Sequence, residues 1–172
     1  AMRSSTYRRQ VVKRLDPDES GERAFSFSDE FADPWYDLHN PEQTDTPMTV
    51  RFQTRRADFP INLQDLEIGN FLLYYVTAEG VDAKELETDL TFTPRDGQGT
   101  VGGKAVPVEK RISTRRTHGN SWIPIIGKPV EGEWELSLPN TTKVKRLFDE
   151  GKIEDILFVI TYEGRAPAWP AR

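Results

Sequence analysis

The chain has 172 residues, a formal net charge of −5 and no cysteine. This length suits one domain with a sizeable core, and the absence of cysteine excludes disulfides and thiolate metal sites. The acidic balance also disfavours nucleic acid as a partner, because phosphate binding favours a basic excess.

The sequence predicts neither a membrane span nor a secretory leader. The longest apolar run, residues 71–76, is far too short to cross a bilayer, and no signal peptide is visible. Ala1 and Met2 resemble a cloning remnant, and strand-like sequence follows at once. We therefore expect residues 1–172 to form a single domain cut from a longer protein.

Candidate strands follow one another along the chain as short alternating or apolar segments, separated by residues typical of turns. They are residues 5–15, 23–31, 48–54, 68–78, 85–94, 105–113, 133–138 and 155–162. Within 105–113, Pro107 favours an edge position, because proline cannot donate a hydrogen bond to a sheet.

Helical spacing is clear in one window, residues 140–151. Its apolar residues are Val144, Leu147 and Phe148. Thr141 or Thr142 could cap a helix there, and Gly151 stands where it would end. With so little helix available for parallel crossovers, the pattern predicts an all-β fold: an antiparallel, jelly-roll-like β-sandwich with one short helix at residues 142–150.

Two of the predicted strands share a pattern. Residues 66–80 and 152–164 each have a polar lead-in, a buried strand and a final Glu-Gly pair. We expect them to be central strands in comparable positions of two halves, although buried strands can simply look alike. Five residues are predicted to lie in the core: Phe71, Leu73, Trp134, Leu157 and Val159.

Residues 29–40 gather aromatic and acidic side chains into a short stretch. Asp33 and Pro34 indicate a helix N-cap followed by proline at the first position. One turn would then place Trp35 and Leu38 on the same face. We interpret the stretch as a plug for one end of the sandwich. Alternatively, the outward residues Tyr36, Asp37 and His39 could form the rim of a binding site.

Glycines at 97, 99 and 102 make a formal dinucleotide-binding spacing. The motif requires a helix directly after it, so that the helix N-terminus meets the phosphates. Here a proline and β-branched residues follow, which favours a flexible hairpin loop.

No catalytic or metal-binding set is visible in the sequence. The two histidines, His39 and His118, lack metal-ligand spacing. There is no nucleophile elbow and no thiol, and nothing singles out two of the many carboxylates as a glycosidase pair. We expect the chain to be neither an enzyme nor a cofactor-binding protein.

Two groups of residues are candidate binding sites. Residues 109–120 concentrate cations on an acidic chain, namely Lys110, Arg111, Arg115 and Arg116. They could meet an acidic partner or a sugar acid, or form an ordinary solvated loop. Trp122 and Trp169, with Tyr36, are candidates for stacking on sugars. We expect Trp122 to be half-buried, whereas Trp134 alternates with leucines and belongs to the core.

The last third of the chain contains two patterned pieces. The first is a Trp-x-Leu-x-Leu-Pro strand made by Trp134, Leu136, Leu138 and Pro139. The second is carried by Ile153, Asp155, Ile156, Leu157, Ile160, Tyr162 and Arg165. Together these pieces resemble the end of the A component of bacterial Tc insecticidal toxin complexes. The chain departs from the family pattern at Glu163 and Gly164, where the family has Thr-Ala, and at residues 128–130. About a quarter of the chain carries the resemblance, mostly at core positions.

In that family the region is a β-sandwich at the end of a very large pore-forming chain, where it holds the B component. The resemblance therefore implies a non-enzymatic assembly module that binds a partner protein subunit and is secreted or surface-exposed as part of a larger toxin complex. The alternative from the residues alone is a carbohydrate-binding sandwich with a glycan as ligand.

Overall fold

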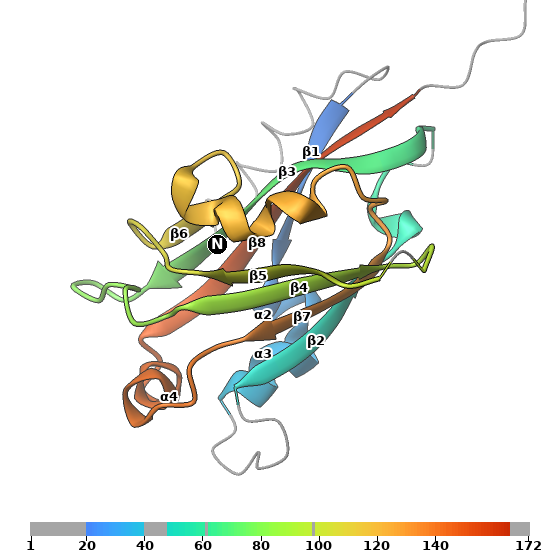
Figure 1. The fold of residues 1–172 in the computed structure, drawn as a ribbon. Coiled ribbons are helices and arrows are strands. Elements are labelled where there is room, and N and C mark those ends of the chain that lie inside the picture. The colour runs from blue at the N-terminus through green and yellow to red at the C-terminus, as the bar shows by residue number, and fades with distance from the viewer. Residues whose placement is uncertain (1–19, 40–47, 61, 98, 166–172) are drawn as a thin grey trace, which may run out of the picture.

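The structure, a computed structural model, describes residues 20–39, 48–60, 62–97 and 99–165. Two four-stranded antiparallel sheets form its two layers (Figure 1). Sheet A has the order β1 (Ser20–Ser26), β8 (Ile153–Arg165), β3 (Gln64–Thr77) and β6 (Arg111–Ser113). Sheet B has the order β2 (Thr49–Thr54), β7 (Gly132–Ser137), β4 (Thr88–Pro94) and β5 (Val101–Ala105). This is the strand order of a jelly roll, so the predicted fold is confirmed.

Helical segments connect and cover the sheets. The predicted helix near the C-terminal end is α4 (Thr142–Asp149), and the Thr141 hydroxyl accepts a hydrogen bond from the Val144 amide at 3.2 Å. Four further short segments were not predicted as helices over these bounds: α2 (Phe27–Glu30), α3 (Ala32–Leu38) and the 3₁₀ segments η1 (Arg56–Asp58) and η2 (Thr117–Ile125). None of the helices among the described residues is long and apolar enough to cross a membrane.

The core is centred on aromatic rings contributed by both sheets. Trp134 of β7 is buried, with its ring centroid 4.2 Å from that of Phe92 and 4.8 Å from that of Phe158. Phe71 and Leu73 of β3 are buried as predicted. Every second residue of β4 is buried, so its sequence alternation matches its two faces.

The two most apolar strands form the centre of sheet A. β3 and β8 pair with each other along most of their length, with irregularities at three places. Both are central strands, as predicted. The expectation of comparable positions in two halves is wrong, because they are neighbours in one sheet.

One core prediction on β8 is also wrong. Ile156, Phe158 and Ile160 point into the core, so Leu157 lies on the outer face of sheet A and is only partly buried. Val159 is buried, but it lies on the same outer face and outside the main core. The run from Ile156 to Ile160 has no polar residue to mark which face turns inward.

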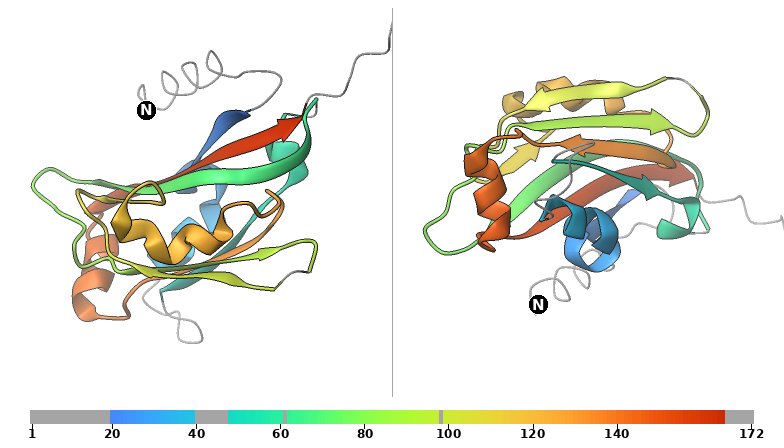
Figure 2. Two further views of the ribbon diagram at one scale, coloured as in Figure 1. Left: turned by 45° about the horizontal axis from the view of Figure 1, so that its top comes forward. Right: turned by 90° about the horizontal axis from the view of Figure 1, so that it is seen from below.

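Two segments close the open edges of the sandwich. At one edge, Phe27 of α2 and Phe31, between α2 and α3, pack against Phe52 of β2 with ring centroids 4.9 and 4.8 Å away. At the opposite edge, η2 lies between β5 and β6 (Figure 2). Trp122 of η2 is fully buried and stacks on Phe71 at 5.3 Å between ring centroids.

The predicted plug is therefore present, but it closes an edge between the two sheets rather than an end of the sandwich, and its details also differ. α3 begins at Ala32 rather than after Asp33, and no side chain caps it. Leu38 is buried and Trp35 packs against the core, as expected, while Tyr36 points outward. His39 does not: its Nδ1 lies 2.7 Å from the Trp35 carbonyl oxygen, and its ring packs on Phe148. The predicted strand 5–15 lies outside the described residues.

The glycine-rich segment is a hairpin loop, as predicted. It joins β4 to β5, which pair with each other in sheet B. Gly97 and Gly99 have positive φ angles in this loop, which glycine adopts without strain. A strand rather than a helix follows, so the segment lacks the helix N-terminus that a dinucleotide site needs.

Candidate interaction surface

The surface formed by residues 106–125, from the β5–β6 loop through β6 to η2, is called the η2 edge below. Its three arginines, Arg111, Arg115 and Arg116, are all exposed. Arg111 lies 3.5 Å from the exposed Glu109 carboxylate, a pairing of the kind that contributes little to stability. Among the described residues, no ion pair joins Arg115 or Arg116 to a carboxylate. The predicted basic loop is thus a solvent-facing group of cations.

Charge is strongly biased in this part of the chain. Residues 101–128 contain six Lys and Arg residues against one acid, Glu109, although the whole chain carries −5. Lys110 differs from the arginines, because it is half-buried and its carbonyl oxygen accepts a hydrogen bond from the Tyr75 amide at 2.8 Å. Its backbone therefore fixes the start of β6.

A histidine lies among these arginines. The His118 Nε2 accepts a hydrogen bond from the Ser113 amide at 3.2 Å, which requires an unprotonated Nε2. Burial lowers the pKa of His118, and the positive charges of Arg111 and Arg116 lower it further. The ring is therefore neutral at pH 7 and acts as an acceptor. Sequence reasoning missed this role, since it depends on a turn that brings residue 118 back to β6.

The outer backbone groups of β6 are all occupied. Val108 and Arg111 exchange two amide–carbonyl hydrogen bonds, at 2.9 and 3.2 Å. The Ser113 carbonyl accepts from the Arg116 amide at 3.1 Å, and the Ser113 amide donates to His118. A sheet edge usually presents such groups to other chains, so this edge is closed to the addition of another strand.

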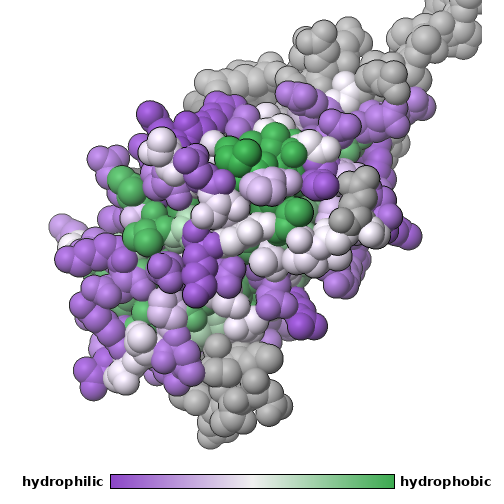
Figure 3. All heavy atoms as spheres, viewed as in Figure 1, coloured by the Kyte–Doolittle hydropathy of each residue, from purple (hydrophilic) through white to green (hydrophobic). Residues whose placement is uncertain are grey.

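Aliphatic side chains are also exposed within residues 106–125. Val106 is 44% exposed, Val108 50% and Ile123 43%. Figure 3 shows apolar patches broken up by hydrophilic surface on the face that carries η2. The sequence assigned Val106 and Val108 to a strand, in which one face would be buried. The loop instead turns both valines outward around Pro107, which is buried.

The buried side of the η2 edge explains why η2 adopts this path. The Trp122 Nε1 donates to the Gly103 carbonyl oxygen at 2.8 Å. Gly119 lies so close to β6 that a Cβ would collide with the Ser113 carbonyl oxygen. Trp122 has no exposed surface, which corrects the expectation of a half-buried ring. A ring enclosed in this way offers no face on which a sugar can stack.

The other two aromatic residues predicted to stack on sugars are Tyr36 and Trp169. Tyr36 on α3 is 72% exposed and offers a single free ring. Trp169 lies outside the described residues. The aromatic residues predicted as sugar platforms are therefore not brought together on one sheet face within the part of the chain that the structure describes.

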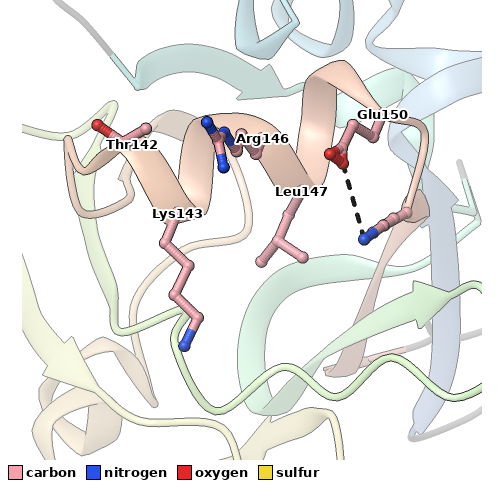
Figure 4. A pocket seen from close by; sticks show the side chains of 6 residues that line it. Thr142, Lys143, Arg146, Leu147 and Glu150 are labelled. Carbon is pink, nitrogen blue, oxygen red and sulfur yellow. Dashed lines mark ion pairs between the residues drawn. The ribbon is translucent and has the colours of Figure 1, made fainter.

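A depression of about 430 Å³ lies along α4 (Figure 4). Its cations are partly engaged, since Lys143 lies 3.0 Å from Glu85 and Lys152 lies 3.7 Å from Glu150. Arg146 and Leu147 also line it. The side chains spread along one helix face rather than converging on a common point, so the geometry does not indicate a reaction centre.

Clustered metal ligands are absent from the residues that the structure describes, where no three His, Asp or Glu side chains form a group able to hold an ion. The two histidines make backbone contacts: the His39 Nδ1 lies 2.7 Å from the Trp35 carbonyl oxygen, and the His118 Nε2 accepts from the Ser113 amide at 3.2 Å.

Comparisons with known proteins gave little. The sequence matches no family model and no curated protein. Among solved structures, the cryo-EM structure of Morganella morganii TcdA4 is similar, with a TM-score of 0.48 and 16% sequence identity. The match covers 93% of this chain and 8% of that chain, so the chain spans a small fraction of its length.

Proposed function

We propose that the chain is a non-enzymatic interaction module that holds a partner protein subunit through its η2 edge. The observation that carries this proposal is the combination of exposed aliphatic side chains and exposed arginines on an otherwise acidic chain. Val108 and Arg111 are hydrogen-bonded to each other through their backbones, so one exposed valine lies next to one exposed arginine.

This combination suits a protein partner. Interface cores are more apolar than their rims and are enriched in arginine. Apolar side chains are stabilised when a partner removes them from water, whereas arginine is stabilised by ion pairs and hydrogen bonds with the partner. The resemblance of residues 134–139 and 153–165 to the Tc toxin A component supports the same class of function, a module within a larger secreted bacterial toxin complex.

A carbohydrate-binding role has less support. It would require aromatic rings free to stack on a sugar. Of the candidates, Trp122 is enclosed and Tyr36 stands alone on α3. No single feature of the described residues therefore favours a glycan over a protein.

The proposal is tested by capturing partners from an extract of the organism that encodes the chain. The bait is the wild-type chain, and the edge variant is Arg115→Glu with Arg116→Glu. The control variant, Lys143→Glu with Arg146→Glu, makes the same change of charge on α4. We expect one protein to be enriched by wild type and control but lost with the edge variant.

The captured protein is then purified, and its binding to the three baits is measured by titration. If wild type binds no purified protein, the interaction function is wrong. If the edge variant binds the partner as tightly as wild type does, the function stands and the η2 edge is the wrong surface.

A further inference from the structure

The chemistry of the η2 edge restricts the kind of partner it fits. The cations of this edge, Lys110, Arg111, Arg115 and Arg116, would repel a basic partner and attract an acidic one, and Glu109 is the one acid among residues 106–125. Charge complementarity of this kind selects partners and accelerates their encounter. An acidic partner surface is therefore favoured.

The exposed aliphatic residues distinguish between classes of acidic partner. Val106, Val108 and Ile123 gain less from a sulfated sugar or a phosphate backbone, whose surfaces are dominated by charged and polar groups, than from apolar side chains. An acidic polypeptide can supply carboxylates for the arginines together with apolar side chains for the valines and the isoleucine.

The closed edge of β6 restricts the binding mode. The outward amides and carbonyls of Arg111 and Ser113 already bond to Val108, Arg116 and His118. A partner strand would have to break these bonds before it could pair with β6, which is costly for backbone groups that lose their partners.

We infer that the η2 edge binds an acidic polypeptide segment bearing apolar side chains, through side-chain contacts rather than by adding a strand to β6. This inference rests on the proposed function and adds the chemistry of the partner. Arg115 and Arg116 engage its carboxylates, while Val108 and Ile123 contact its apolar groups.

Short labelled peptides of equal length test this inference without the natural partner. One peptide combines Glu and Leu, a second replaces Leu by Ser, a third replaces Glu by Lys, and a heparin fragment represents a polyanionic sugar. Binding is followed by fluorescence anisotropy at about 0.01 M and about 0.15 M ionic strength, because screening weakens exposed charge pairs over this range.

The Glu-Leu peptide is expected to bind more tightly than the other three probes. At the lower ionic strength, Arg115→Ala with Arg116→Ala should weaken it about tenfold, since each arginine contributes charge complementarity. Val108→Ser with Ile123→Ser should weaken it as well. The matched control, Lys143→Ala with Arg146→Ala, should leave it unchanged.

Three outcomes would overturn the inference. Equal binding of the Glu-Leu and Lys-Leu peptides would remove the role of charge. Equal binding of heparin or the Glu-Ser peptide would remove the role of the aliphatic residues. Hydrogen-exchange protection at alternate amides of the bound peptide would indicate an added strand. Each of these leaves open whether the purified partner binds, so the inference and the proposed function can fail separately.

Discussion

The two open edges of the sandwich are closed by different segments that solve the same packing problem. At the α2–α3 edge, Phe27 and Phe31 fill the space against Phe52, and at the η2 edge Trp122 fills it against Phe71. Inside, both segments are aromatic plugs that the core requires. The aromatic residues on the inner sides of both segments are therefore explained by the need to fill the core.

The outer sides of these two edges differ in charge and in exposed apolar residues, and folding does not require this difference. Between residues 27 and 38 the chain has four acids and no Lys or Arg, in keeping with its overall charge. The η2 edge instead exposes arginines, valines and an isoleucine. An outer surface that is cationic on a chain with a net negative charge is a candidate for a functional surface.

The largest expected effect tests the common role of the two plugs. Replacing either Trp122 or Phe27 by alanine removes a fully buried ring, which should lower the free energy of unfolding by about 3–5 kcal/mol. Urea denaturation of both variants measures this. A loss within experimental error for Trp122→Ala would show that η2 does not close the sandwich and would break the comparison.

A smaller effect is expected where the α2–α3 edge is tied to sheet A. The Asp155 carboxylate on β8 accepts hydrogen bonds from the Ser26 hydroxyl and from the Ser28 amide, the latter at 3.1 Å. Asp155→Ala leaves these groups without their partner and should cost about 1–3 kcal/mol. Its exposed neighbour provides the control, because Glu154→Ala should change stability by less than about 0.5 kcal/mol. Equal losses would mean that Asp155 does not hold α2.

The corresponding tie at the η2 edge should depend on pH. The pKa of His118 is lowered in the folded chain by burial and by Arg111 and Arg116. As the pH falls below about 6.5, the unfolded chain takes up this proton more readily than the folded chain, so the His118 contribution to stability declines. Above that pH it is fully present.

The variant His118→Gln isolates this contribution, because an amide oxygen can accept from the Ser113 amide without titrating. We expect the stability of wild type to fall relative to His118→Gln between about pH 7.5 and about pH 5, the range in which histidine changes charge. Urea denaturation across this range measures the difference. A constant difference would show that protonation does not affect the tie between η2 and β6.

The sequence predicts the fold well wherever alternation and turn residues are unambiguous. The strands around Phe52, Phe92 and Trp134 are correct because polar residues separate their buried ones. Leu157 was misassigned because its neighbours are apolar on both sides, and periodicity of two then fits either face. The helical turns α2 and η2 were missed because tertiary packing of Phe27 and Trp122, rather than local propensity, holds them.

The surface was predicted in part. The cationic residues of the η2 edge are visible in the sequence, since charge can be counted along the chain. The exposure of Val106 and Val108, the enclosure of Trp122 and the contact between His118 and Ser113 are not, because each depends on how β6 and η2 meet in space.

The smallest change in stability is expected for the two arginines on which the proposed interaction depends. Arg115→Ala with Arg116→Ala removes two exposed charges, so the free energy of unfolding should change by less than about 0.5 kcal/mol. Urea denaturation checks this. A large loss would mean that these arginines hold the fold rather than a partner.

The most direct test of the account is the association rate of the purified partner with wild type, with Arg115→Ala plus Arg116→Ala, and with the matched control Lys143→Ala plus Arg146→Ala. Rates are compared at about 0.01 M and about 0.15 M ionic strength, where screening differs strongly. The account predicts slower association and a flatter salt dependence for the Arg115 and Arg116 variant alone. Identical rates for wild type and this variant at both ionic strengths would contradict it.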